Sequence, residues 1–299
     1  MPGEIQTILK RFDSQQSEKR HPFTKFSMRL LFGATMSKRA KTLIKTGGGR
    51  LAAASGMYAR GFSSKMVVIA FHRVSNHLMG DGLTCSGAKF EAFCRFFQQY
   101  FKVVPFSEQV AGCRAGRNMG GTLSITFDDG YLDNFEVAVP ILRRLGLPAT
   151  FFIVTGFVGS KVVPFWDRHL PSQAGWMSWD QLRALAAQGF EFGCHTDTHI
   201  DMGAVDEQVV REELELSTQK LKREIGVSAE LFAYPFGGKQ HINERSKQIV
   251  RGIGFSCCAS CYGGANPPIA DPFDLRRIGI ADWFDRPHQF GFELLTNRA

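Results

Sequence analysis

The chain has 299 residues, 44% of them hydrophobic and 27 of them Phe, and its formal net charge is +8. This length and apolar content allow a large buried core, which excludes a mostly disordered protein. Residues 1–66 hold thirteen Lys or Arg and three Asp or Glu, whereas the remainder is slightly acidic. We therefore expect a basic N-terminal arm over residues 1–65 and one catalytic domain over residues 66–299.

The basic arm contains no apolar run of the roughly 18 residues that a membrane-spanning helix needs. Its segment Leu30–Ala34 is too short for the core of a signal peptide. Apolar and basic residues alternate over residues 23–39, a pattern that suits peripheral membrane contact. A flexible or loosely helical lead-in explains the same pattern and is favoured. We expect a cytoplasmic protein, held at most at the inner membrane face, with no nucleic-acid partner.

Beyond residue 65, short apolar runs alternate with amphipathic segments. The run at 66–71 is typical of a strand covered on both faces. The apolar spacing over 90–101 predicts a helix. Further strands are predicted at 123–127, 149–154, 190–194, 231–234, 255–259 and 275–280, and further helices at 137–145, 178–188, 210–225 and around 249–250.

Repeated strand–helix units argue for an α/β fold with a parallel sheet and helices outside it. Seven or eight strands favour closure, so we predict a distorted (β/α) barrel of about seven parallel strands. An open doubly wound sheet is the alternative. No GxGxxG or phosphate-binding loop follows any strand, so neither a dinucleotide site nor a nucleoside triphosphate site is expected.

Polar residues capable of catalysis follow the ends of several predicted strands. The carboxyl ends of parallel strands meet at one face of a barrel, where active sites are built. Residues far apart in the sequence are therefore expected to meet. The residues concerned are His72, Asp128, Asp129, His195, His199 and the segment Pro235–Gly238.

Two of these motifs fit a metal site when taken together. His195 and His199 are four residues apart and can face one metal if the segment turns helically. Thr196 stands where a zinc protease needs Glu, which disfavours protease chemistry. Taken singly, the motifs have plainer interpretations as an acidic turn and two surface histidines. Two His and one carboxylate form a common catalytic zinc or iron ligand set, and a second Asp supplies a base.

Three segments resemble the first three motifs of the polysaccharide deacetylases, carbohydrate esterase family 4 with the NodB-homology domain. They are Thr126–Gly130, His195-Thr196-x-x-His199 and Phe232–Gly237. The resemblance spans roughly residues 66–285. It implies a distorted (β/α) barrel, a divalent metal that is usually Zn²⁺, and a hydrolase of carbon–nitrogen bonds other than peptide bonds.

The resemblance also assigns roles to residues. It implies that Asp129, His195 and His199 are metal ligands and that Asp128 is the general base. The opening Phe71–Val74 resembles the branch of the family in which a histidine, here His72, serves as general acid. The plainer interpretation of His72 is a core histidine at a strand end.

The residues support the same mechanism from chemistry alone. A bound metal lowers the pKa of water to about 7, and Asp128 takes the proton as water attacks the acetamide carbon. The backbone N–H of Phe236 is the expected second donor to the oxyanion. His72 can protonate the leaving amine, because imidazole titrates near neutral pH.

The third motif departs from the common family pattern. Ala233 stands where an arginine that tunes the base is more usual, and we hypothesise that Arg277 on a late strand replaces it. Tyr234 in the third motif and Trp283 past the last strand are further candidates for substrate contact or for support behind the site.

The main prediction is hydrolysis of N-acetyl groups from N-acetylglucosamine units of a glycan, with release of acetate. An inactive glycan-binding module and a hydrolase of non-sugar amides are the alternatives. Among the seven cysteines, Cys257, Cys258 and Cys261 include one CxxC pair. Buried thiols are favoured over a zinc knuckle there, because no second pair follows.

Overall fold

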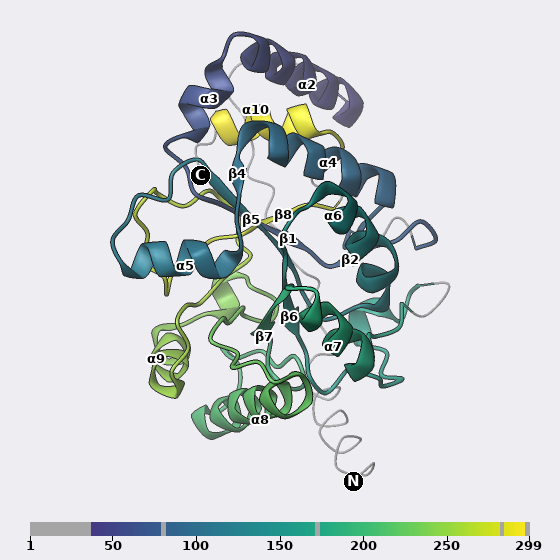
Figure 1. The fold of residues 1–299 in the computed structure, drawn as a ribbon, viewed down its shortest axis with the longest axis vertical. Helices are drawn as coiled ribbons and strands as arrows, with labels where there is room; N and C mark the ends of the chain where they lie inside the picture. The colour runs from purple at the N-terminus through teal and green to yellow at the C-terminus, as the bar shows by residue number, and fades with distance from the viewer. Residues whose placement is uncertain (1–36, 79–81, 171–173, 282–283, 297–299) are drawn as a thin grey trace. The chain divides into compact units, whose positions relative to one another are not determined.

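The computed structural model describes residues 37–78, 82–170, 174–281 and 284–296 (Figure 1). The segment predicted to touch a membrane lies mostly outside these residues. The helices are α2 Lys38–Ala54, α3 Met57–Phe62, α4 Gly87–Tyr100, α5 Phe106–Arg114, α6 Val139–Leu145, α7 Trp179–Ala187, α8 Glu207–Ile225, α9 Glu244–Ile253 and α10 Pro287–Leu295. The strands are β1 Val67–Phe71, β2 Arg73–Val74, β3 Thr84–Cys85, β4 Lys102–Val103, β5 Thr122–Phe127, β6 Thr150–Ile153, β7 Glu191–Cys194 and β8 Ile278–Gly279.

The main sheet is parallel and has the order β7-β6-β5-β1-β8, with β4 beside β5. The register of β1 on β5 runs from Val67 opposite Leu123 to Phe71 opposite Phe127. Every residue of β1 and β5 is buried. Continuous apolar runs were therefore the correct signal for strands covered on both faces.

Three isolated parallel bridges carry the sheet onward from β7 to β8. They join Cys194 to Phe232, Ala233 to Ala259, and Ala259 to Leu275. Since β8 pairs with β1, the ring closes through seven strand positions in the part of the chain that is described. The predicted distorted barrel is confirmed, and the alternative of an open doubly wound sheet is wrong.

The late part of the barrel is more irregular than predicted. The expected strands at 231–234 and 255–259 are reduced to single bridges, and the expected strand at 275–280 keeps only β8. Pro235 has no N–H for a ladder, and Phe236 and Gly237 both have a φ of 61°. Extended pairing therefore stops directly after Tyr234.

The predicted helix ends are confirmed where local chemistry sets them. The Ser178 side chain and the Gln181 side chain form a reciprocal capping box at the start of α7. Helix α8 ends at Gly226, which has a left-handed φ of 71° that glycine adopts without strain. The helix predicted at 137–145 begins earlier than expected, as a π-helical turn over Asn134–Ala138.

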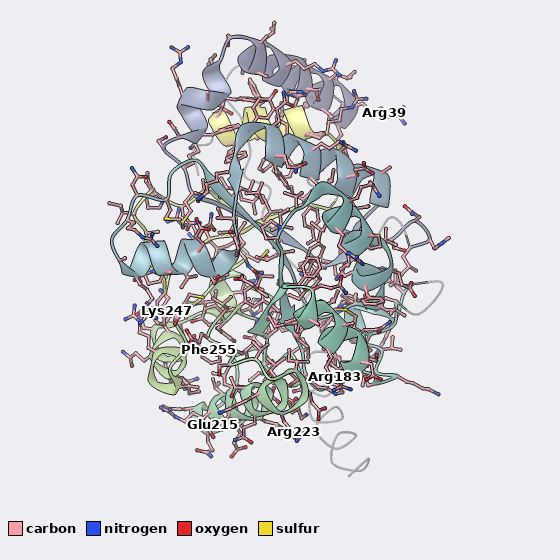
Figure 2. The ribbon with its side chains drawn as sticks, viewed as in Figure 1. Arg39, Arg183, Glu215, Arg223, Lys247 and Phe255 are labelled. Atoms are coloured by element: carbon pink, nitrogen blue, oxygen red, sulfur yellow. The ribbon has the colours of Figure 1, made fainter. Side chains whose placement is uncertain are left out.

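Phenylalanine dominates the core between the sheet and its helices. The ring of Phe71 lies 4.9 Å from that of Phe90 and 5.6 Å from that of Phe127. Phe127 in turn stacks on Phe151 at 4.9 Å. Figure 2 shows how densely side chains fill the interior. This packing explains the high Phe count, because buried aromatic rings contribute large apolar areas.

Helices α2 and α3 pack against the C-terminal helix α10. Lys45 forms an ion pair of 2.9 Å with Glu293, and Tyr58 stacks on Phe62 with ring centroids 4.7 Å apart. The domain boundary at residue 65 stays a prediction. No described helix combines the length and hydropathy needed to cross a bilayer.

Candidate metal centre and catalytic site

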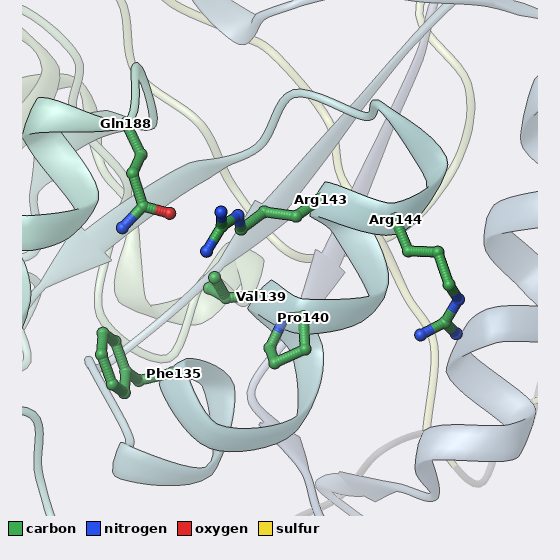
Figure 3. Close-up of a pocket in the computed structure, with 6 residues that line it drawn as sticks. All are labelled: Phe135, Val139, Pro140, Arg143, Arg144 and Gln188. Carbon is green, nitrogen blue, oxygen red and sulfur yellow. The ribbon is translucent and has the colours of Figure 1, made fainter.

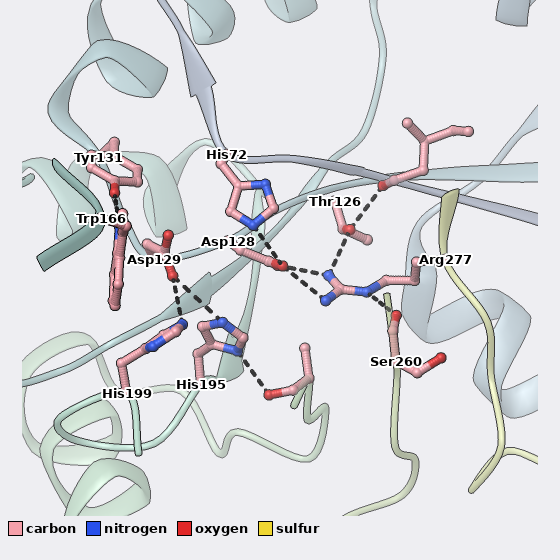
Figure 4. Close-up of polar contacts among 12 residues, drawn as sticks. His72, Thr126, Asp128, Asp129, Tyr131, Trp166, His195, His199, Ser260 and Arg277 are labelled. Atoms are coloured by element: carbon pink, nitrogen blue, oxygen red, sulfur yellow. Dashed lines mark hydrogen bonds and ion pairs between the residues drawn. The ribbon is translucent and has the colours of Figure 1, made fainter. Parts of the chain in front are cut away.

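The structure brings together the three residues predicted to be metal ligands (Figure 4). Asp129 follows β5, and His195 and His199 follow β7. Asp129 Oδ1 lies 3.5 Å from His195 Nε2 and 3.4 Å from His199 Nε2. Two ligands held about 2.0–2.1 Å from one tetrahedral Zn²⁺ would be roughly 3.4 Å apart. The observed spacings therefore fit one small cation.

Burial and hydrogen bonding in this cluster also suit a cation. Asp129 is 2% exposed, and its Oδ1 is buried with no hydrogen-bond donor among the described residues. Burial and the neighbouring Asp128 raise the pKa of Asp129 well above its usual value. A buried carboxylate of this kind is costly unless a positive charge compensates it.

Both imidazoles are held in the neutral form that metal coordination needs. Burial lowers the pKa of His195 to about 4 and lowers that of His199 well below its usual value. His195 Nδ1 lies 2.7 Å from the backbone carbonyl oxygen of Ala233. That contact places the proton on Nδ1 and leaves Nε2 free to bind a metal, as in many metal sites.

The backbone at the site is strained. Four described non-glycine residues have positive φ, namely Asp129 at 71°, Thr196 at 63°, His199 at 61° and Phe236 at 61°. All four belong to the predicted site motifs. Such strain persists only where the surroundings enforce it, and it concentrates at functional sites. It also corrects one expectation: the segment from His195 to His199 is a loop with left-handed residues and not a helical turn.

A carboxylate on helix α8 holds this loop in place. Glu213 Oε2 accepts hydrogen bonds from the backbone N–H groups of Asp197 and Thr198, at 2.9 and 2.7 Å. Glu213 Oε1 accepts a third, from the Thr198 hydroxyl at 2.6 Å. Lys220 Nζ, also on α8, donates to Asp197 Oδ1 at 2.7 Å. This support has no signal in the sequence, because a single glutamate on a charged helix belongs to no motif.

Asp128 and Arg277 form a buried pair with two parallel hydrogen bonds. Arg277 Nη1 donates to Asp128 Oδ1 at 2.6 Å, and Nη2 donates to Oδ2 at 2.8 Å. Arg277 Nε donates to the Ser260 carbonyl oxygen at 2.9 Å, and Nη1 also donates to Thr126 Oγ1. The guanidinium thus lies where the hypothesis of a replacement arginine requires. Its effect on turnover stays a prediction.

The charge of Arg277 governs the ionisation of Asp128. Burial alone would raise the pKa of Asp128, but the charge of Arg277 and its hydrogen bonds to the carboxylate outweigh burial and lower the pKa to about 2. Asp128 is therefore ionised near neutral pH, as a proton acceptor must be. Two adjacent carboxylates are given opposite pKa shifts, which is how one site obtains two different acid–base roles.

His72 lies beside Asp128 and is partly exposed. Its Nε2 is 3.9 Å from Asp128 Oδ2, and its side chain is 24% exposed. Burial lowers the pKa of His72, while Asp128 opposes that shift. Asn134 Nδ2 donates to the His72 backbone oxygen at 2.8 Å and fixes the end of β1. His72 is therefore close enough to Asp128 for a proton to pass between the two side chains.

Phe236 contributes its backbone and its ring. No described group accepts a hydrogen bond from the Phe236 N–H. Its ring lies 4.6 Å from His199 and 5.9 Å from Trp166. The left-handed backbone at Phe236 turns the chain beside the ligand cluster. The N–H is therefore available for the predicted oxyanion contact.

The two remaining predicted residues do not join the cluster. Tyr234 is 2% exposed and packs against Phe232 with ring centroids 5.0 Å apart. The neighbouring Ala233 contacts His195 through its backbone carbonyl oxygen, whereas Tyr234 is buried in the core. The expectation of substrate contact for Tyr234 is therefore not supported by its position. Trp283 lies outside the described residues.

A second set of hydrogen-bonded side chains lies beside the metal ligands, and no sequence motif signals it. Trp166 Nε1 donates to the Tyr131 hydroxyl at 2.9 Å, and that hydroxyl donates to Asp167 Oδ2 at 2.8 Å. Asp167 pairs with the fully buried Arg73. The Trp166 ring lies 4.6 Å from His199 (Figure 4). Arg73, which follows His72 in the sequence, thus supports the residues that pack beside the metal ligand His199.

A surface depression is lined by none of the predicted site residues. It has a volume of about 590 Å³ and is bordered by the π-helical turn Asn134–Ala138, α6 and Gln188 (Figure 3). Arg143 and Arg144 line it, but no carboxylate or imidazole does. It therefore lacks the groups that hydrolysis needs.

Comparison with known proteins agrees with the geometry of the site. The sequence profile of the family described as polysaccharide deacetylase matches residues 115–258. Residues 115–258 belong to the polysaccharide deacetylase family. The deacetylase domain is accordingly that of a hydrolase acting on carbon–nitrogen bonds other than peptide bonds.

Two curated relatives share most of their length with this chain. The putative polysaccharide deacetylase YxkH of Bacillus subtilis (strain 168) is 22% identical over 220 residues, covering 73% of this chain and 72% of the relative. The poly-beta-1,6-N-acetyl-D-glucosamine N-deacetylase of Staphylococcus aureus (strain MSSA476) is 25% identical over 207 residues, covering 66% of this chain and 68% of the relative.

Solved structures of deacetylases have the same fold. IcaB from Ammonifex degensii aligns with a TM-score of 0.63 at 24% identity, covering 77% of this chain and 97% of that chain. The Streptococcus pyogenes deacetylase PplD in complex with acetate aligns with a TM-score of 0.63 at 20% identity, covering 76% and 96%. At these identities the likeness shows the fold alone.

Proposed function

We propose that this chain removes N-acetyl groups from N-acetylglucosamine units of an oligo- or polysaccharide, with one divalent cation bound. The observation that carries the proposal is the cluster of Asp129, His195 and His199, with donor atoms spaced for one cation and with Asp128 beside it. The relative from Staphylococcus aureus named for poly-beta-1,6-N-acetyl-D-glucosamine supports the substrate class.

Asp129, His195 and His199 would hold the cation. When bound, a divalent cation of this type supplies Lewis-acid chemistry, since it polarises a carbonyl oxygen and makes water more acidic. Zn²⁺ suits one carboxylate and two imidazoles with a position left open.

The chain's own residues carry the proton transfers. Asp128, kept ionised by Arg277, accepts a proton from the water that attacks the acetamide carbon. The N–H of Phe236 donates to the developing oxyanion. His72 donates a proton to the nitrogen as the carbon–nitrogen bond breaks, because its lowered pKa makes the imidazolium a ready proton donor. Acetate and a free amino sugar are the products.

The test is acetate release by the purified full chain from a panel of substrates. The panel contains N-acetylglucosamine oligomers with different linkages and a simple acetamide, each assayed before chelation, after chelation and after return of Zn²⁺. We expect release from oligomers, loss with chelator and recovery with metal. Release from the acetamide alone would point to a non-sugar amide hydrolase. Glycan binding without any acetate release would point to an inactive binding module.

A further inference from the structure

Helix α2 exposes a row of large apolar side chains. Leu43 is 57% exposed, Ile44 61% and Leu51 74%, and Met57 at the start of α3 is 50% exposed. We call these four residues the apolar ridge. Elsewhere in the described chain, a large apolar side chain exposed to this degree stands alone, at Ile269 with 59% exposed. Scattered exposure is normal for a protein surface, whereas a continuous row marks an interaction site.

The opposite face of α2 is already occupied, so the ridge cannot turn inward. Thr42, Thr46, Gly49 and Ala52 are buried. Gly49 sits so close to α10 that an added Cβ would lie 2.0 Å from the His288 carbonyl oxygen. The ion pair between α2 and α10 described above fixes the helix further. Packing against α10 therefore presents the ridge outward.

The ridge is bordered by positive charge on both sides. Helix α2 contains five Lys or Arg and no Asp or Glu. At helical spacing, Arg39 and Arg50 fall beside Leu43 on one border, and Lys41 falls beside Ile44 on the other. These three basic side chains are exposed, and Figure 2 shows Arg39 at the outer surface of α2.

We propose that the apolar ridge and its basic borders dock this chain on the surface of an anionic lipid bilayer. A helix with an apolar stripe between Lys and Arg lies in the membrane interface, with the charged heads at the level of the lipid phosphates. Charge decides the occupant, because a border of basic side chains with no Asp or Glu on the helix attracts anionic headgroups. The proposal is independent of the chemistry at the metal cluster.

Vesicle flotation of the full chain tests this docking. The vesicles are phosphatidylglycerol mixed with phosphatidylcholine, compared with phosphatidylcholine alone. We expect the chain to float with the anionic vesicles, less at high salt, and not with the neutral ones. The variant Leu43→Ser/Ile44→Ser/Leu51→Ser should lose about tenfold or more in affinity, because three apolar side chains no longer enter the interface. The matched control is Val209→Ser/Leu216→Ser on α8, with side chains 39% and 43% exposed, which should bind as the wild type does.

A second variant keeps the test decisive if the serine variant is poorly folded. Arg39→Glu/Arg50→Glu changes only exposed side chains and should abolish flotation while circular dichroism and melting stay unchanged. Two results overturn the proposal outright: a wild-type chain that does not float with anionic vesicles, and serine and glutamate variants that float as well as the wild type. A dimer in lipid-free solution that depends on the ridge would also overturn it, because a second copy would then be the occupant.

Discussion

Arg277 donates two charged hydrogen bonds to Asp128, although 149 positions separate the two residues in the chain. The arginine comes from the start of β8 and the aspartate from the end of β5, and β1 lies between these strands in the sheet. The pair is fully enclosed, with both side chains at most 3% exposed. An enclosed pair of this kind cannot lose one member without leaving a charge unpaired in the interior.

Replacing Arg277 with alanine should therefore reduce turnover by about 100-fold, because the pKa of Asp128 rises and its carboxylate loses its orientation. Melting temperature should also fall, since breaking a buried pair costs roughly 3–5 kcal/mol. Metal content should stay near that of the wild type. The measurements are kcat, bound metal and thermal melting; Arg277→Lys should recover part of kcat. Unchanged turnover in Arg277→Ala would remove the role assigned to this residue.

The metal centre itself gives the second prediction. His195→Ala and His199→Ala should each lower the affinity of the protein for Zn²⁺ by at least about tenfold, because only two of three protein ligands remain. Bound metal is measured by elemental analysis after dialysis and by titration of the metal-free protein. Asp180→Asn, at a fully solvated acid on α7, is the control and should keep full metal content. If the histidine variants retained stoichiometric metal, the cluster would not be the metal site.

Glu213 gives a prediction about positioning. Glu213→Gln keeps the size of the side chain but replaces one acceptor oxygen with a donor group, so the loop holding His195 and His199 should loosen. Loss of such supporting contacts lowers metal affinity by about 10–100-fold. Competition with a chromogenic chelator measures that affinity without relying on activity. Glu215→Gln, on the exposed face of the same helix, serves as the matched control, and equal affinities in both variants would contradict the role.

Asp133 gives a prediction about pH and stability. Burial raises the pKa of Asp133 to about 7, although its carboxylate accepts a hydrogen bond from the Val74 N–H. The folded protein thus keeps a proton that the unfolded chain releases near pH 4. This group therefore makes folding less favourable as pH rises from about 4 to about 7.

Asp133→Asn should remove that penalty while keeping an oxygen for the Val74 N–H. As pH rises from about 5 to about 8, the free energy of unfolding of the variant should increase relative to that of the wild type by on the order of 2–4 kcal/mol. Urea unfolding at both pH values measures the difference. A constant difference between wild type and variant across this range would show that Asp133 does not titrate there.

Much of the fold could be predicted because its signals are local. The apolar run at β1, the capping box at Ser178 and the glycine after α8 each depend on neighbours within a few residues. The site residues were predicted for a related reason. Parallel strands direct their carboxyl ends to one face, so Asp129 and His195 had to converge once the strands were recognised.

Other features depend on contacts between distant segments, and no local pattern of residues signals them. The loop from His195 to His199 was expected to be helical, but its backbone N–H groups donate to the Glu213 carboxylate, which holds the loop in a strained left-handed form. Strands were expected at 231–234 and 255–259, yet each is reduced to isolated bridges. In the loop, the tertiary contact with Glu213 overrode the local preference of the chain.

The sequence by itself determined the order of strands and helices, the helix ends and the set of residues available for chemistry, because periodicity and capping act over a few positions. Only the tertiary structure decided the closure of the barrel, the pairing of Arg277 with Asp128 and the outward orientation of the ridge on α2. These features depend on which distant surfaces pack together, and packing is settled by the shape and burial of the whole domain rather than by any one segment.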